Sequence, residues 1–243
     1  GNEVFFQNFT GTSAVEVAGK FGGEFETRYD VLMTNALVTS TAQGNTWSYA
    51  KEQYLTAPAF KKSGPKTLTL TKPSTYVCAT DVAEGTLKLA NEGSLLSTTV
   101  ARLTGGTFDL GGNDQTLKAL CGTAGEVKNG SVTVTEGIYP GGAGTIGSFS
   151  VGAALAGTLF VDVDATGAAD SITTTTALDL SNIDLVITAP ATAPDVPRRL
   201  KIVNGPFAGA FKSVTGLPAG WTLRYGDGRV TVGPDRGSTL ILR

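Results

Sequence analysis

The sequence predicts an all-β protein, built largely as a right-handed parallel β-helix (a β-solenoid) with coils of about 20 residues and β-rich caps at both ends. Three observations predict it. Gly, Thr and Ser are abundant while Met occurs once. Short runs alternate apolar and polar residues, which is typical of strands. A short motif also recurs at a spacing near 20 residues. A β-sandwich is the alternative fold.

The alternation is clearest in Thr67–Leu70, Ser131–Thr135 and Phe160–Asp164. Each run places apolar side chains on one face and polar side chains on the other. Clusters of Gly, Asn and Pro end the runs and indicate turns. The sequence favours one helical turn, near Tyr49 to Leu55.

The repeat begins at Lys66-Thr-Leu-Thr-Leu and recurs from Gly85, Gly106 and Gly125, in steps of 19, 21 and 19 residues. After a Gly-rich interruption at 140–147, a weaker form resumes with a 20-residue step. Residues at equal offsets should stack one strand spacing (~4.8 Å) apart along the axis. We expect two inward rows: Leu68, Leu87, Phe108 and Val127, and Leu70, Leu89 and Leu110.

The two cysteines fall in different coils. Cys78 belongs to the coil that starts at Lys66, Cys121 to the coil that starts at Gly106, and one coil lies between them. Their separation along the axis is then about 10 Å, beyond the ~4.4–6.8 Å between Cα atoms that a disulfide permits. We therefore expect no bond between them.

The stretches Thr67–Leu70, Ser74–Tyr76 and Gly85–Leu89, followed by Gly105–Leu117, resemble the autotransporter-associated β-strand repeat of large bacterial surface proteins. Residues 140–164 and 220–243 resemble segments that often follow these repeats. The resemblance covers roughly residues 65–243, and Cys78 stands where the family usually has Gly. It implies a right-handed parallel β-helix exported to the surface of a Gram-negative-type bacterium.

The organisation expected is an N-terminal β cap or assembly segment at 1–65, a β-solenoid at 66–189 and a C-terminal β-strand cap at 190–243. The first segment lies outside the repeat and is rich in aromatic residues. A strand within it could add to a neighbouring copy of the chain. The predicted assembly residues are Val4, Phe5, Phe6 and Phe9.

No catalytic residue is expected. The chain has no His, which excludes a Ser/His/Asp triad, a Cys–His nucleophile and a Cys/His zinc site. Paired carboxylates are the remaining chemistry, and we interpret them as outward strand and turn residues. The carboxylates in question are Asp109, Asp114, Asp162, Asp164, Asp179 and Asp184.

One loop is a weak calcium candidate. Asp162 and Asp164 share a strand face, and a turn at Gly167 could return Asp170 toward them. The favoured interpretation is solvated carboxylates at a strand end, so no cofactor other than calcium enters the prediction.

Two smaller patterns are given structural interpretations. The basic stretch from Lys61 to Lys66 is interpreted as a solvated turn. Trp221 and Tyr225 alternate with Leu223 and are expected in the core.

Composition limits the function. The net charge is −2 with no basic stripe, which argues against nucleic-acid binding. No apolar run approaches the ~20 residues of a transmembrane segment. We expect a secreted, extracellular, non-enzymatic structural subunit of a filament or surface layer on a bacterial cell surface, assembled head to tail with itself. The alternative is an adhesin or glycan-binding module, with a glycan or host surface as partner. A carbohydrate-active enzyme is a more distant alternative.

Overall fold

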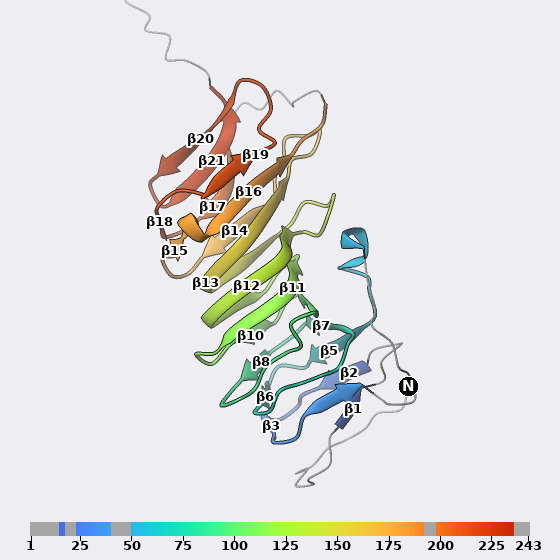
Figure 1. Ribbon diagram of the computed structural model, residues 1–243. Coiled ribbons are helices and arrows are strands. Elements are labelled where there is room, and N and C mark those ends of the chain that lie inside the picture. The colour runs from blue at the N-terminus through green and yellow to red at the C-terminus, as the bar shows by residue number, and fades with distance from the viewer. Residues whose placement is uncertain (1–14, 18–22, 40–49, 192–197, 236–243) are drawn as a thin grey trace, which may run out of the picture.

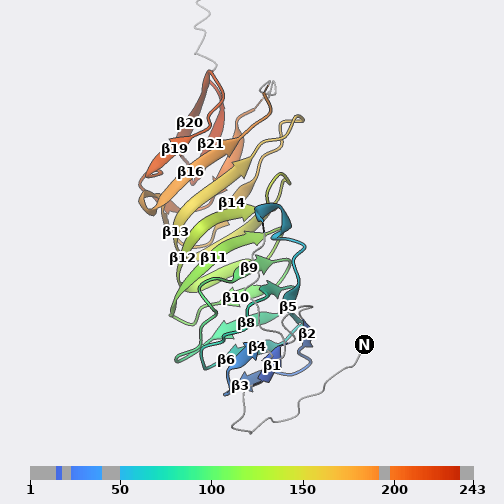
Figure 2. The same cartoon turned by 45° about the vertical axis from the view of Figure 1, so that its right-hand side comes forward.

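The protein is a parallel β-solenoid of about six turns, with 56% of its residues in strands, in the computed structural model. This confirms the predicted fold class. The structure describes residues 15–17, 23–39, 50–191 and 198–235. The coils stack into an elongated body, with β2 and β3 near one end and β20 and β21 at the other (Figures 1 and 2).

Each coil contributes a strand to a parallel sheet that we call the first face. Successive strands on it pair with the coil before and the coil after. Its members are β3 (Val31–Met33), β6 (Thr67–Leu70), β8 (Thr86–Leu89), β10 (Thr107–Asp109), the first halves of β12 (Glu126–Pro140) and β13 (Ser148–Asp162), β14 (Ser171–Thr174) and β17 (Leu200–Asn204).

A second face is built in the same way and is parallel from its first strand to its last. Its members are β2 (Gly23–Glu26), β5 (Ala59–Ser63), β7 (Ala79–Val82), β9 (Val100–Leu103), the second part of β11 (Asp114–Gly122), the last parts of β12 and β13, β16 (Ile183–Thr188) and β19 (Ser213–Thr215).

Shorter strand pairings are made by the segments that connect a first-face strand to the next second-face strand. The first part of β11 pairs with the middle of β12, which pairs with the middle of β13. Two short parallel pairs occupy the equivalent place in other coils: β1 (Val15–Val17) with β4 (Leu37–Thr39), and β15 (Leu178–Asp179) with β18 (Phe207–Ala208).

The predicted inward rows are confirmed. Leu68 pairs with Leu87, Leu87 with Phe108 and Phe108 with Val127, all through parallel strands. All four side chains are fully buried. In the second row Leu70 pairs directly with Leu89, and Leu110 is equally buried. Because these apolar side chains stack coil upon coil, they form one continuous core.

The parallel pairing extends beyond residues 66–189 on both sides. It already includes β2, β3 and β5 before residue 66, and it continues into β17 and β19 after residue 189. The C-terminal end is different, because β21 (Arg229–Pro234) pairs antiparallel with both β17 and β20 (Trp221–Gly226). This hairpin covers the last first-face strand.

Helix is confined to two short turns in the described residues. The turn η2 (Lys51–Gln53) falls where a helical turn was predicted, and η3 (Leu180–Asn182) precedes β16. Neither is long or apolar enough to cross a membrane.

The two cysteines are free and occupy different environments. Cys78 lies in the continuous core, whereas Cys121 lies in a separate apolar cluster outside the second face. The strand register also places them in different coils, since Cys121 pairs with Arg102, and Arg102 pairs with Asp81 in the coil of Cys78.

Candidate functional site

The N-terminal end of the solenoid presents strand edges. Within the described residues β2 pairs only with β5, and β3 pairs only with β6. The Thr71 N–H donates to the Met33 carbonyl at 3.1 Å, so Met33 faces β6. Backbone groups alternate in direction along a strand, and those of Leu32 therefore face the open edge.

The C-terminal end is open on the second face. In the described part of the chain β19 pairs only with β16, on one side. The Lys212 N–H donates to the Ile183 carbonyl at 2.9 Å. The Ile183 carbonyl therefore faces β19, and by alternation so do the backbone groups of Leu185. Because Leu185 lies opposite Val214, its partners are Ser213 and Thr215, and the backbone groups of Val214 face away from β16, toward the end of the molecule.

Large apolar side chains are exposed only near these ends among the residues that the structure describes. Tyr29 is 78% exposed and Leu32 63% exposed, and both lie at the N-terminal end. Tyr225, 40% exposed, lies on β20 at the other end. Tyr225 was predicted to be in the core, which is wrong. It lies on the terminal hairpin, which no further coil of the described residues covers, whereas Trp221 on the same strand is buried as predicted.

The predicted assembly residues Val4, Phe5, Phe6 and Phe9 lie outside the described residues. Their role therefore stays a prediction, and the strand edges are the assembly feature on which the structure bears.

A groove of about 350 Å³ opens on the outer side of the first face. We call it the polar groove, because Thr hydroxyls, ammonium groups and carboxylates line it. The lining residues are Asp30, Thr67, Thr69, Thr86, Lys88, Asp109 and Lys128. Several are direct cross-strand neighbours, since Lys88 pairs with Asp109 and Asp109 with Lys128. The repeat thus aligns outward polar side chains just as it aligns the inward leucines.

The carboxylates of the polar groove are held by backbone N–H groups and by one side-chain amide. One Asp109 oxygen accepts from the Gly111 N–H at 2.9 Å and from the Asn129 amide at 3.1 Å. Asp30 accepts from the Thr67 N–H at 2.9 Å, a bond that lowers the pKa of its carboxyl group. Lys88 has no carboxylate within 4.0 Å in the described structure. Among the same described residues, Lys128 has one carboxylate within that distance, that of Glu126 at 3.8 Å.

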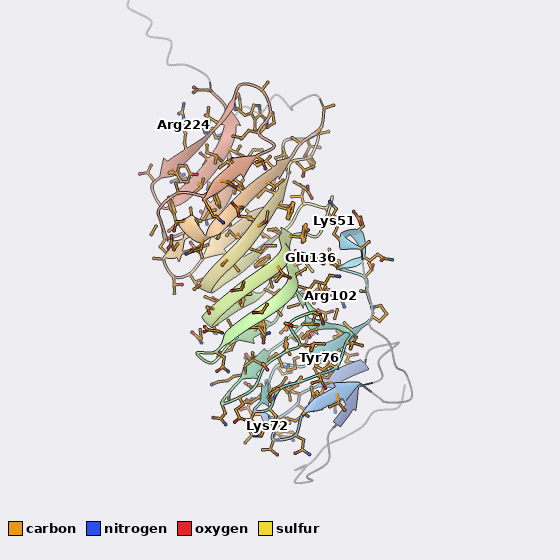
Figure 3. The ribbon with its side chains drawn as sticks, viewed as in Figure 1. Lys51, Lys72, Tyr76, Arg102, Glu136 and Arg224 are labelled. Atoms are coloured by element: carbon orange, nitrogen blue, oxygen red, sulfur yellow. The ribbon has the colours of Figure 1, made fainter. Side chains whose placement is uncertain are left out.

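A segment of residues 50–58, which we call the strap, covers the outer side of the second face. The Tyr54 hydroxyl donates to the Glu136 carboxylate, and the Lys118 ammonium lies 5.8 Å from the centre of the Tyr54 ring. Arg102 donates to the Ala57 carbonyl at 2.8 Å and to Asp81 at 3.3 Å. Arg102 and Glu136 lie on the solenoid beside the strap (Figure 3).

Each of the three predicted calcium ligands accepts hydrogen bonds from a different set of backbone N–H groups. Asp164 accepts from Thr166 and Ala168 within its own turn, and these bonds lower the pKa of its carboxyl group. Asp162 accepts from the Gly144 N–H at 2.6 Å. Asp170 is buried and accepts from the N–H groups of Gly147 and Asp162. No group of three or more acidic, His or Cys side chains in the described residues could hold a metal ion.

The remaining carboxylates considered for chemistry also have local roles. Asp114 accepts from the Ser131 hydroxyl, and Asp184 from the Ser213 hydroxyl at 2.6 Å. Asp179 caps η3 by accepting from the Ser181 N–H at 2.9 Å. The Asp179 carboxylate therefore stabilises a turn, and those of Asp114 and Asp184 link neighbouring coils.

The basic stretch was interpreted incorrectly at one position. Lys62 is fully buried at the end of β5, and its ammonium group donates to the carbonyls of Ser63, Gly64 and Glu84 at 2.8, 2.9 and 2.8 Å. It holds a corner of the solenoid together, while Lys61 on the outer side pairs with Glu24 at 2.9 Å.

Comparison with known proteins finds no family model that matches this chain and no curated protein that matches it. Sequence reasoning missed the polar groove, although its signal was present. The outward residues of the repeat sit at the same offsets as the inward ones and include Thr69, Lys88 and Asp109.

Proposed function

We propose that the protein is a secreted, non-catalytic structural subunit of an extracellular filament or surface layer on a bacterial cell, in which copies join head to tail. The observation that carries this proposal is the second face. It is parallel throughout, and its terminal strands β2 and β19 each have one neighbour in the described structure.

An open strand edge presents unpaired N–H and C=O groups that can pair with another chain. Because all strands of the second face run in the same direction, β19 of one copy and β2 of the next can pair and continue the parallel sheet. Such a contact joins two different surfaces, and it gives an open fibre when the rotation between copies does not close. The exposed Leu32 near one end and Tyr225 near the other favour burial at such junctions.

Val214 offers a direct test. It lies on β19 opposite Leu185 and is half-buried at the open end of the core. In a single subunit, the substitution Val214→Lys lets the ammonium group reach solvent at this end. In a junction the same charge is buried without a partner, at a cost of about 3 kcal/mol or more, or about 100-fold in association.

The native protein is expected to form filaments or sheets visible by negative-stain electron microscopy and to sediment as polymer. Val214→Lys should stay monomeric with an unchanged circular dichroism spectrum. The matched control is Ser213→Lys, on the same strand with its side chain exposed and beside Asp184, which should assemble normally.

Native protein that remains monomeric at high concentration would contradict the filament, and assembly of Val214→Lys would contradict this junction. Deletion of residues 1–10 tests the N-terminal prediction separately. If the shortened chain polymerises as well as the full chain, Val4, Phe5, Phe6 and Phe9 are not the connector.

A further inference from the structure

We propose that the polar groove binds an extended acidic polysaccharide that carries a carboxylate on alternate sugars. The groove opens on the outer side of the first face, whereas the proposed filament junction lies at the ends of the second face. This binding activity is therefore separate from assembly.

The groove runs along the solenoid axis. Its lining residues come from the turn before β3 and from β6, β8, β10 and β12, which are successive first-face strands. A ligand that follows the groove crosses the strands and meets a new coil about every 4.8 Å. An elongated chain of repeating units matches this surface better than a compact molecule does.

The ammonium groups define the charge pattern. Lys88 and Lys128 lie on the same outward row and are separated by one strand, that of Asp109. Two strand spacings place their attachment points about 9.6 Å apart. Asp109 directs an oxygen toward Gly111 and Asn129, and Lys88 has no carboxylate within 4.0 Å in the described residues. Both ammonium groups therefore have donors left for carboxylates on alternate units of a ligand.

The other lining groups favour a carbohydrate. The hydroxyls of Thr69 and Thr86 face outward and make no hydrogen bond to any part of the protein that the structure describes. Hydroxyls both donate and accept, which suits the hydroxyls of a sugar. Tyr29, the residue before Asp30 of the groove, is 78% exposed and offers an aromatic surface for the apolar face of a sugar ring.

The acidic side chains argue against a densely charged ligand. Asp30 and Asp109 balance the charges of Lys88 and Lys128, so the lining carries no net charge. A nucleic acid places phosphates along its whole length and requires clustered cations. Closely spaced negative charges would be repelled by Asp30 and Asp109, whereas a polysaccharide with widely spaced carboxylates can place them at Lys88 and Lys128.

The test is isothermal titration calorimetry of the full-length protein with a hyaluronan octasaccharide, in which every second sugar is acidic. Neutral chitohexaose is the comparison ligand. We expect the octasaccharide to bind with a submillimolar dissociation constant that weakens with added salt. Chitohexaose should bind at least about tenfold more weakly, a difference of about 1.4 kcal/mol.

Two variants probe the groove. Lys88→Gln/Lys128→Gln should weaken octasaccharide binding about tenfold, since two exposed ion pairs are lost. Tyr29→Ala should weaken it about threefold. The matched control Lys72→Gln/Lys201→Gln removes the same charge from exposed lysines outside the groove and should bind as the native protein does.

Equal binding by native protein and Lys88→Gln/Lys128→Gln would overturn the proposal. Equal weakening by the control pair would also overturn it, because it would indicate non-specific attraction of a polyanion. So would equal binding of chitohexaose, or no binding of either ligand at millimolar concentration. Val214→Lys should bind the octasaccharide normally, so failure of the filament proposal and failure of this one are distinguishable.

Discussion

Asp170 is a buried carboxyl group whose pKa is shifted in opposite directions by its burial and by its hydrogen bonds. Burial raises the pKa of Asp170 to about 7, although the N–H groups of Gly147 and Asp162 favour its charged form. Its ordinary pKa is 3.8. Between these values the folded protein holds a proton that the unfolded chain has lost. The stability that this proton contributes is therefore fully present below about pH 4 and is lost as the pH rises through about 7.

The variant Asp170→Asn cannot titrate and retains one acceptor oxygen. We expect the stability of the native protein relative to Asp170→Asn to fall between pH 4 and 7, with a slope of at most about 1.4 kcal/mol per pH unit. Urea unfolding of both proteins at several pH values measures this difference. Parallel stability curves for the two proteins would contradict the assignment.

Single residues were the least predictable from sequence. Lys62 was interpreted as solvated because charged residues are rarely buried. Its burial depends on three carbonyls, one of which belongs to Glu84, 22 residues away. Tyr225 was misplaced for a related reason. Alternation identifies the face of a strand but not whether another coil covers that face.

The strap shows how one element can protect a side chain on another. Tyr54 is buried against Cys121 and Tyr139, in a cluster on the outer side of the second face. Tyr54→Ala should remove this cover and leave the core of the solenoid intact. We expect Cys121 to react with a thiol reagent in the folded variant, while Cys78 in the core stays protected.

The reaction can be followed by mass spectrometry of peptides after labelling under native conditions. Tyr29→Ala is the control, because Tyr29 is exposed and lies at the N-terminal end. Unreactive Cys121 in Tyr54→Ala would mean that Tyr54 is not what shields the thiol. Equal labelling of both cysteines would instead indicate general unfolding.

At the level of elements, the regular coils could be predicted and the irregular ones could not. Residues 66–128 repeat in steps of 19 to 21, so equal offsets identified the buried ladder directly. The pairing of β3 with β6 joins Val31 to Leu68, a step of 37 residues. The strap lies within that step, so the first coil does not show the period of the others. Small outward residues such as Ala79 and Ala119, which the strap covers, gave no signal of their own.

The whole molecule behaves as a stack in which each coil rests on its neighbours. In the described part of the chain the end coils have one neighbour each, and we therefore expect them to open first. A junction between copies supplies the missing neighbour and binds only the folded form, so it stabilises both ends more as the protein concentration rises.

We therefore expect the amides of β2, β3 and β19 to exchange with deuterium more slowly as the concentration of native protein rises. The central strands β8, β10 and β12 are already covered on both sides and should change little. In Val214→Lys, exchange in the end strands should not depend on concentration, because its junction buries an unpaired charge. Concentration-dependent protection confined to the central strands, or equal protection in Val214→Lys, would be incompatible with end-to-end assembly.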